Sequence, residues 1–199
     1  EGPIQSIKSI YASDTELTDV NGDITHELEE VTLNVHLGEP DQVADSRDPS
    51  GSTYAHVAYV GLTLKAQDGL SGNPTISSIV EGRKIWTPVG TVFSRNPAWI
   101  VYDFLTNTRY GVGVPPDLID LDSFMASADY CDALVEGEPR FTLDYIIDTQ
   151  RPAVDHLQSM LACFRGYFLA RDKIELHVEQ AGSIYKALGP DNFVKDSFS

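Results

Sequence analysis

Apolar and polar residues alternate in several stretches of the N-terminal half, which is the pattern of a β strand with one buried face. Residues 31–37 read VTLNVHL, where every second side chain is apolar. Alternation over 58–65 and a strand-like run over 76–86 predict two more strands. Residues 14–23 read DTELTDVNGD and are dense in turn-forming types, so the chain is expected to begin as short strands joined by turns.

A polar segment interrupts this pattern at 43–52, which reads VADSRDPSGS. Residues of these types favour turns and linkers. We therefore expect a domain boundary near this segment. The predicted division is a β unit over 1–45, a β-strand pair over 46–92 and an α+β module over 93–199.

The stretch 96–113 reads NPAWIVYDFLTNTRYGVG and predicts one short helix with both ends marked. Asn96 can accept a hydrogen bond from a free backbone N–H as the N-cap, and Pro97 at the first helical position loses no hydrogen bond. Gly111 and Gly113 are expected to end the helix. Apolar residues cover more than one face of the helix, so we expect it to be largely buried.

Helices and strands alternate in the pattern that follows. Apolar residues at helical spacing over 121–134 predict a helix that Asp120 or Asp122 caps. The elements expected beyond it are a strand over 141–147, a helix over 152–166 and a hairpin over 167–178. The fold class predicted for the chain is thus α+β, with a β-rich N-terminal part followed by a helix-strand-helix-hairpin module.

Composition adds a strong acidic balance to this picture. The chain has 30 Asp and Glu residues against 14 Lys and Arg, which gives a formal net charge of −16. This charge is expected to repel nucleic acid and anionic membranes. The alternative interpretation is that the acidity serves solubility. No signal peptide and no apolar run of about 18 residues are found, so no membrane segment is expected. Because the chain begins at Glu1 without an initiator Met, we expect a piece of a longer protein.

The two cysteines, Cys131 and Cys163, are too few for a disulfide scaffold and occupy apolar helical positions. They are expected to be free, buried thiols of a chain that folds in the cytosol.

Metal chemistry finds little support. Residues 19–24 resemble part of an EF-hand calcium loop, but Leu17 and Leu28 stand where calcium needs a carboxylate and a bidentate Glu. The pair Asn21-Gly22 is therefore interpreted as a hairpin turn. The histidines are far apart in sequence and are expected on strand faces and turns. They are His26, His36, His56, His156 and His177. We expect no metal and no cofactor.

The sequence also lacks a nucleophile elbow, a phosphate-binding glycine loop and a basic strand for single-stranded nucleic acid. The basic residues Arg83, Lys84, Arg95 and Arg109 are expected to cluster loosely around the central helix and to pair with nearby acids. Paired carboxylates for glycan cleavage need only be close in space, so a cell-wall hydrolase stays open as an alternative.

The segment 96–113 is similar to the segment NPAW-x-x-x-D-x-LT-x-x-RYG-x-G of the central tail-hub proteins of long-tailed bacteriophages, the tip attachment (host specificity) protein J family. Three other parts resemble the same family in the same order: IYASDTELTDVNGD with VTLNVHLGEPDQ, then VEGRKIWTP, then the region from LDSFMASADYCD to ACFRG. The motif residues, with no catalytic role expected, are Gly82, Arg83, Asn96, Pro97, Trp99, Asp103, Leu105, Arg109, Tyr110, Gly111 and Gly113.

The resemblance implies a structural component of a phage tail tip and no enzyme. In the family the chain forms a homotrimer, and related barrel-like domains close a ring at the end of the tail tube. The N-terminal strands are therefore expected to belong to a barrel or sandwich whose remaining strands lie outside this chain. The implied partners are the tail tube or distal tail protein and tip proteins, with DNA only as passing cargo. The implied location is the virion tail tip, after assembly in the bacterial cytoplasm.

Two other functions remain as alternatives, a peptidoglycan hydrolase and a carbohydrate-binding receptor module. A receptor module would expose Trp and Tyr side chains on one surface. Trp86 and Trp99, in contrast, lie in segments that are expected to be buried. The acidity suggests one more hypothesis for the hub, that a negatively charged lumen would not retain DNA.

Overall fold

A computed structural model describes residues 2–25, 31–65 and 72–181 of the chain. It divides into two compact units, Glu1–Asp103 and Phe104–Ser199. The division falls inside helix α1, Pro97–Thr106, so this helix starts in one unit and ends in the other. Each unit is described below by itself.

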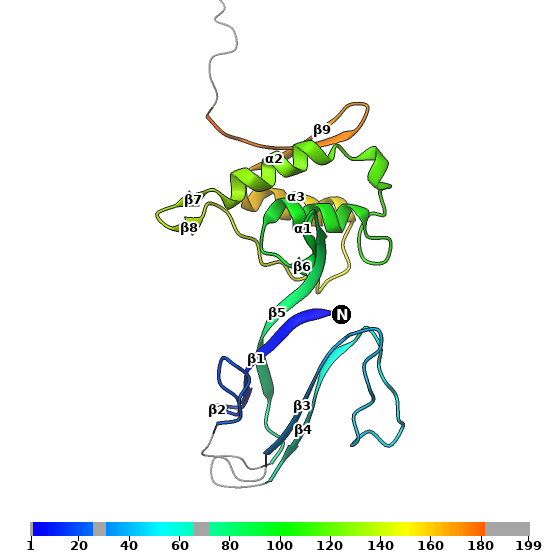
Figure 1. Ribbon diagram of the computed structural model, residues 1–199, viewed down its shortest axis with the longest axis vertical. Helices are drawn as coiled ribbons and strands as arrows, with labels where there is room; N and C mark the ends of the chain where they lie inside the picture. The colour runs from blue at the N-terminus through cyan, green and yellow to red at the C-terminus, as the bar shows by residue number, and fades with distance from the viewer. Residues whose placement is uncertain (1, 26–30, 66–71, 182–199) are drawn as a thin grey trace, which may run out of the picture. The chain divides into compact units, whose positions relative to one another are not determined.

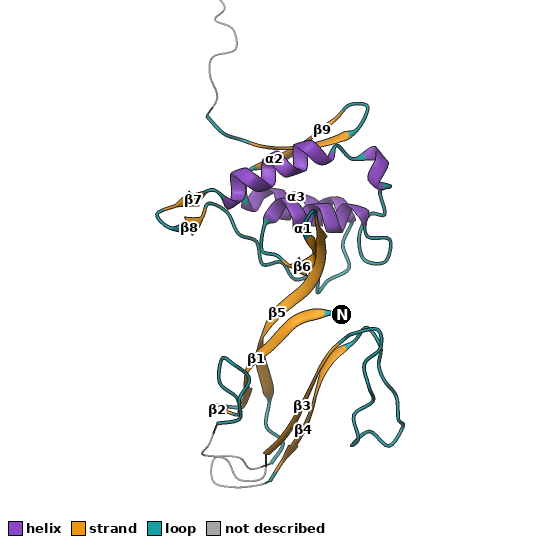
Figure 2. Cartoon of the chain, in the orientation of Figure 1, coloured by secondary structure: helices purple, strands orange, loops and turns teal. Residues whose placement is uncertain are grey.

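The first unit is built from antiparallel strands (Figures 1 and 2). One sheet has the strand order β2-β1-β5-β6, and a separate hairpin pairs β3 with β4. The strands are β1 (Ile4–Ala12), β2 (Thr15–Glu16), β3 (Val31–Leu37), β4 (Ala58–Leu64), β5 (Ile76–Thr87) and β6 (Gly90–Phe93). The strands predicted over 31–37, 58–65 and 76–86 are thus confirmed, with small shifts at their ends.

The β3–β4 hairpin packs its apolar residues against β1. Ile10, Ala12 and Leu17 form a fully buried cluster. Partly buried side chains pack against this cluster; they are Ile7, Leu33, Val60, Leu62 and Leu64. Alternate side chains of β4 thus face this apolar core together with Leu33 of β3. Val35, which belongs to the same alternating row of β3, is 41% exposed.

The predicted hairpin turn at Asn21-Gly22 is confirmed. An antiparallel bridge joins Thr18 to Ile24, and Gly22 has a φ of +86°. The Asp19 carboxylate accepts hydrogen bonds from the backbone N–H groups of Asn21 and Asp23 at 2.8 and 3.0 Å. These bonds lower the pKa of Asp19, and they engage the carboxylate in closing the turn.

The second unit combines helices with small hairpins (Figure 1). Its helices beyond α1 are the 3-10 turn η1 (Pro116–Leu118), α2 (Leu121–Asp132) and α3 (Ala153–Cys163). Its strands are β7 (Leu134–Val135), β8 (Glu138–Pro139), β9 (Gly166–Ala170) and β10 (Ile174–Val178). The two predicted helices and the terminal hairpin are confirmed. No described helix has the length and apolar character that a membrane crossing requires.

Helix α2 is fixed to strand β10 by two hydrogen bonds that its serine hydroxyls form with Leu176. The Ser127 hydroxyl donates to the Leu176 carbonyl at 2.9 Å, and the Leu176 N–H donates to the Ser123 hydroxyl at 3.0 Å. Asp120 caps α2, as predicted, by accepting from the N–H groups of Asp122 and Ser123. Fully buried Phe124, Phe164 and other apolar side chains lie in the core of this unit, including Ile119, Met160 and Leu176.

The strand predicted over 141–147 is wrong. No residue of this segment is in a strand, although Leu143 is buried and its neighbours Thr142 and Asp144 are exposed, as alternation requires. At its start the Phe141 N–H donates to the carbonyl of Cys131, at the end of α2, at 3.1 Å. Within the described residues no strand lies beside the segment, and a strand needs a ladder partner as well as an alternating sequence.

The expected barrel or sandwich is not formed by the described strands. They make one sheet of four strands and three sheets of two, and none of these sheets closes on itself. What the structure supports is the broader prediction of a mixed α and β fold.

The division of the chain also differs from the one expected at residues 45 and 92. Segment 43–52 lies in the long connection between two paired strands, with Val31 opposite Leu64 and Leu37 opposite Ala58. A polar, breaker-rich composition marks a loop, but it does not tell whether that loop joins two domains or two neighbouring strands.

The cysteines divide into one buried thiol, as expected, and one exposed thiol. Cys131 is fully buried, whereas Cys163 is exposed, which corrects the prediction for the second residue. Burial raises the pKa of Cys131 to about 12 because it disfavours the thiolate, and the neighbouring Asp132 acts in the same direction.

We expect iodoacetamide at pH 8 to alkylate Cys163 in the folded protein and to leave Cys131 unmodified. After unfolding in guanidinium chloride, both thiols should react, as mass spectrometry would show. A Cys163→Ser variant should take up no label while folded. Rapid labelling of Cys131 in that folded variant would contradict the burial described here.

Candidate functional site

The start of helix α1 is organised by hydrogen bonds from Asn96. Its side-chain oxygen accepts from the Ala98 N–H at 3.0 Å, and its own N–H donates to the Ser94 hydroxyl at 3.1 Å. Asn96 is buried, and Pro97 behind it is fully buried. The predicted N-cap is confirmed, and it satisfies a donor that has no partner inside the helix.

Three aromatic rings pack together beside this helix start. Trp86 on β5 lies 5.1 Å from Tyr102 and 6.2 Å from Trp99, measured between ring centroids, and Trp99 lies 6.2 Å from Tyr102. Trp99 is only 8% exposed, whereas Trp86 is 42% exposed. The expectation that both tryptophans are buried is therefore right for Trp99 and wrong for Trp86.

The end of helix α1 is closed by the segment that follows it. The carbonyls of Phe104 and Leu105 accept from the N–H groups of Val112 and Val114 at 2.9 and 2.8 Å. The Asn107 side chain accepts from the N–H groups of Arg109 and Tyr110 at 2.9 and 3.3 Å. The bonds from Val112 and Val114 supply partners for carbonyls at the end of the helix that have none inside it.

Glycine is required at Gly111 and at Gly113, in the segment after the helix, for different structural reasons. A Cβ on Gly111 would collide with the Phe104 carbonyl oxygen and lie 2.9 Å from that of Asn107, so no larger residue fits there without a shift. Gly113 has a φ of +77°, a conformation that glycine adopts without strain. Helix α1 itself ends at Thr106, so the expectation that Gly111 and Gly113 end it is wrong. The two glycines shape the segment that follows the helix.

The other motif residues occupy varied positions. Leu105 is buried, Asp103 and Tyr110 are half-buried, and Arg109 is exposed. On β5, the guanidinium of Arg83 donates to the Gly2 carbonyl at 2.9 Å. Around Gly82, by contrast, a Cβ would meet no atom within 4 Å, so space does not require a glycine there.

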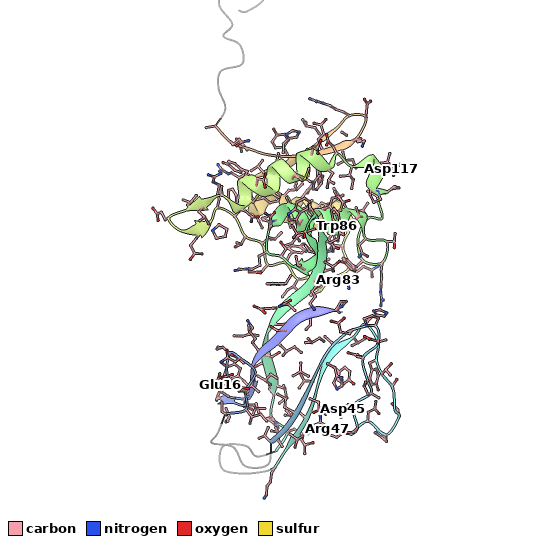
Figure 3. The ribbon with its side chains drawn as sticks, in the orientation of Figure 1. Glu16, Asp45, Arg47, Arg83, Trp86 and Asp117 are labelled. Carbon is pink, nitrogen blue, oxygen red and sulfur yellow. The ribbon has the colours of Figure 1, made fainter. Side chains whose placement is uncertain are left out.

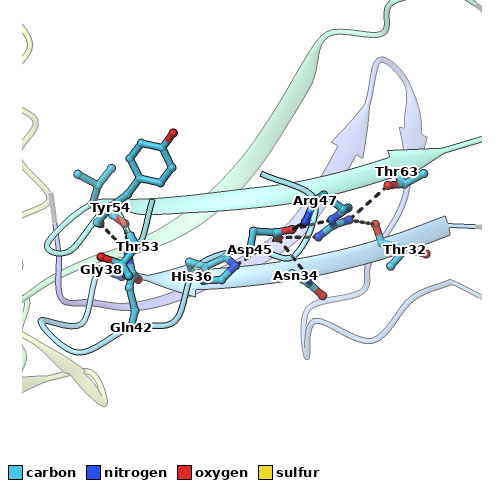
Figure 4. Close-up of polar contacts among 11 residues, drawn as sticks. Thr32, Asn34, His36, Gly38, Gln42, Asp45, Arg47, Thr53, Tyr54 and Thr63 are labelled. Carbon is cyan, nitrogen blue, oxygen red and sulfur yellow. Dashed lines mark hydrogen bonds and ion pairs between the residues drawn. The ribbon is translucent and has the colours of Figure 1, made fainter. Parts of the chain in front are cut away.

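The structure brings together a polar cluster that the sequence did not single out, around Asp45 (Figures 3 and 4). Asp45 is only 5% exposed. The Arg47 side chain donates from Nε and Nη2 to the two carboxylate oxygens of Asp45, each at 2.8 Å. The backbone N–H of Arg47 donates to the same carboxylate at 2.9 Å. The Asn34 amide donates at 3.2 Å, and His36 Nε2 lies 3.3 Å away.

This cluster holds the loop between β3 and β4 against both strands. Arg47 also donates to the Thr32 carbonyl at 3.0 Å, and the ion pair lies over Gly61 of β4. A Cβ at Gly61 would collide with the Asp45 carboxylate. Because Asp45 and its ligands come from separate segments, only the short spacing between Asp45 and Arg47 was visible in the sequence.

The hydrogen bonds also fix the charge of Asp45. Those from the Arg47 side chain hold the pKa of this carboxyl well below its usual range, and the backbone N–H of Arg47 acts in the same direction.

A second anchor of the loop is Gln42, whose amide donates to the carbonyls of Thr53, Tyr54 and Val57 at 2.6 to 3.0 Å. The cluster is therefore a rigid support for the loop.

A further polar contact lies in the second unit. The Tyr145 hydroxyl is 2.9 Å from Nδ1 of His156, which is buried on helix α3. His156 thus departs from the expected strand faces and turns, while His36 and His177 lie on strands and His56 in a turn. His26 lies outside the described residues. Among the residues that the structure describes, no three His, Cys, Asp or Glu side chains are grouped as metal ligands would be.

Two of the basic residues expected around the central helix, Arg83 and Lys84, lie on β5 and contact the N-terminal strands and their loop. Lys84 Nζ lies 3.5 Å from the Glu39 carboxylate, and its backbone N–H donates to the Pro3 carbonyl at 3.0 Å. Together with the contact from Arg83 to Gly2, these bonds tie the start of β1 to β5. The expected pairing with acids is seen for Lys84.

Comparison with known proteins gives a partial likeness. No family model matches the chain. Over 81 residues, 37% of this chain, it is 36% identical to the tip attachment protein J of Escherichia phage SECphi27. The chain spans 7% of the length of that relative. This likeness supports a phage tail-related family, the resemblance first seen in the motifs.

Replacing Trp99 by Ala should destabilise the protein by about 3–5 kcal/mol, since it empties a buried ring site beside Trp86 and Tyr102. Chemical denaturation of the purified protein measures this loss. The matched control is Trp86→Ala, which removes a ring of the same cluster that is partly in water and should cost less, about 1–2 kcal/mol. A Trp99→Ala variant as stable as the wild type would show that the helix does not depend on this ring.

Asp45→Asn should lower the free energy of unfolding at neutral pH, because it removes the charge that Arg47 pairs with. The folded-state pKa of Asp45 is depressed, so its stabilising contribution is present above the unfolded pKa of about 4 and is lost as pH falls below it. The stability difference between wild type and variant should therefore be constant above about pH 5 and shrink towards pH 2. Denaturant unfolding at several pH values measures it.

The control for this comparison is Asp41→Asn, which changes an exposed carboxylate in the same loop. This variant should differ from the wild type by no more than about 0.5 kcal/mol. An Asp45→Asn variant with the same small effect would contradict the role of the ion pair.

Proposed function

We propose that this chain is a structural part of the central hub of a phage tail tip, joining the tail tube to the host-recognition apparatus. The observation that carries the proposal is the 36% identity over 81 residues to a tip attachment protein. In this role the protein is a baseplate component of the virion. It is a homotrimer in contact with the tail tube or distal tail protein and with other tip proteins.

The contacts of the motif residues agree with a structural role. Asn96 caps helix α1, Trp99 packs in its aromatic cluster, and Gly111 allows the close return of the chain to the Phe104 carbonyl. Each of these residues is used to build and close one helix. A motif that serves a helix joining two compact units fits a protein whose role is to hold parts together.

The acidity of the chain fits a passage for DNA as cargo. With a net charge of −16, a lumen lined by this protein would repel the DNA backbone and would not retain it by releasing counterions. Under this proposal the acidic side chains face the channel, and an acidic outer surface around a neutral or basic lumen would contradict it.

One observation favours a second candidate, a carbohydrate-binding receptor module. The indole of Trp86 is 42% exposed and packs on Tyr102, which is a way to offer an aromatic face to a sugar ring. A hydrolase has no such observation in its favour, and we propose that the chain has no enzymatic activity. Glycan binding that disappears in Trp86→Ala and survives in Val89→Ala would favour the receptor module.

The hub predicts that the full-length protein has three times its monomer mass in solution. Light scattering coupled to size-exclusion chromatography measures this mass. Antibodies against this chain should also label the tail tip of the virion in electron micrographs. A stable monomer, or virions without label at the tip, would count against the hub, and clearing of purified cell walls would favour the hydrolase.

A further inference from the structure

The β7–β8 hairpin leaves both of its faces uncovered. Leu134 pairs with Pro139 and Val135 with Glu138, and adjacent residues of a strand point to opposite faces. All four residues are exposed, Leu134 at 69% and Val135 at 49%. The hairpin therefore extends away from the end of helix α2, as Figure 1 shows, and offers an aliphatic side chain on each face.

The hairpin is held in one conformation at its tip and at its base. Glu136 and Gly137 form the tip with φ values of +54° and +91°, a two-residue turn whose twist suits paired strands. At the base the Arg140 N–H donates to the Ala133 carbonyl at 3.0 Å, which continues the ladder toward α2. An element that is already ordered loses little conformational entropy when a partner binds it.

Two cations lie at the base of the hairpin and pack on aromatic rings. The Arg140 guanidinium lies 4.0 Å from the centroid of the Tyr130 ring and donates to the Tyr130 carbonyl at 3.2 Å. The Arg165 guanidinium lies 5.6 Å from the centroid of the Phe141 ring. These contacts engage both cations with the base, whereas carboxylates lie along the hairpin and at its tip.

Negative charge therefore dominates the surface around the two aliphatic side chains. Glu136 and Glu138 of the hairpin are exposed, as are Asp129 and Asp132 in the last turn of α2, which contains no basic residue. The C-terminal end of a helix carries partial negative charge, so carboxylates there are repelled by it and by one another. A cationic surface that approached this end would relieve the repulsion.

We propose that residues 134–139 are a docking hairpin that inserts into an apolar groove, rimmed by Lys or Arg, on another tail protein. This rests on the proposed function, because the partner is taken from the tail. Only a concave partner covers both faces of a protruding hairpin. Leu134 and Val135 are then buried against the groove walls, and the Glu136 and Glu138 carboxylates meet the basic rim.

A second copy of the chain is a poorer occupant than a different protein. Each copy carries a net charge of −16, so the acidic hairpin of one copy approaches a surface of the same sign. A basic groove attracts the hairpin instead, and it speeds the encounter. The tests below distinguish the two occupants.

Thiol accessibility compares the isolated full-length protein with the same protein in assembled virion tails. Leu134→Cys should react rapidly with iodoacetamide in the isolated protein and at least about tenfold more slowly in tails, because the core of an interface excludes solvent. Mass spectrometry of the peptide that contains this position measures the rate. The matched control is Val154→Cys, at a position 54% exposed on α3, which should react equally in both states.

Two results of this experiment would overturn the proposal. Equally rapid reaction of the Leu134→Cys thiol in both states would show that nothing covers the hairpin. Slow reaction already in the isolated protein would show that a second copy covers it.

The charge is tested by Glu138→Lys, with Asp117→Lys as the matched control. Asp117 is an exposed carboxylate of the same unit, outside the docking hairpin. Glu138→Lys should enter tails at least about fivefold less than the wild type, because it repels a basic rim, and Asp117→Lys should enter normally. In isolation Glu138→Lys should unfold at the same or a higher temperature than the wild type, because it removes a like charge near the end of α2.

Glu138→Gln removes the charge without adding a cation and keeps the test open if the lysine variant does not fold. It should enter tails less than the wild type and more than Glu138→Lys. If both Glu138 variants enter tails as the wild type does, the basic rim is overturned.

The outcomes separate this proposal from the function on which it rests. If the wild-type protein is absent from tails, both fall. If it is present and the Leu134→Cys thiol stays reactive there, or if both Glu138 variants enter normally, the docking hairpin alone is overturned and the hub role stands.

Discussion

The constraint on which much of the described structure depends is that buried backbone groups need hydrogen-bond partners. Helix α1 is apolar around most of its circumference and buried along most of its length, so its ends have little water to bond with. Asn96 supplies an acceptor at one end, and the return of the chain through Gly111 supplies donors at the other. The unusual composition of this stretch follows from that requirement.

The same requirement explains the loop between β3 and β4. A long polar connection gains no stability from apolar burial, and here buried Asp45 and the amide of Gln42 hold it by bonding Arg47 and a set of carbonyls. Gly61 leaves room for the ion pair. Charged residues in this protein thus serve as internal supports in at least one place, although most of its acidity is a property of the surface.

These two features bear on function in the same way. The residues that first invite a search for chemistry, the NPAW motif and the acidic and polar loop, are engaged in caps, turns and ion pairs. Together with the likeness to a phage tip attachment protein, this pattern favours a protein whose surfaces are used for assembly.

The sequence by itself determined the local structure where the signal lies within a few residues. The N-cap at Asn96, the cap at Asp120 and the turn at Asn21-Gly22 follow from side chains that act on their own neighbourhood. The motif resemblance was equally local, and it pointed to the phage tail before any geometry was known.

Only the tertiary structure decided which segments meet. Alternation over 141–147 is the same whether or not a partner strand exists, and no pattern within the segment tells that none of the described strands supplies one. Asp45 became a buried ion-pair member because β3, β4 and their loop fold onto each other, and Trp86 and Cys163 are exposed because nothing described covers them. Burial is a property of the neighbours that a residue meets in space, and a sequence pattern specifies those neighbours only in part.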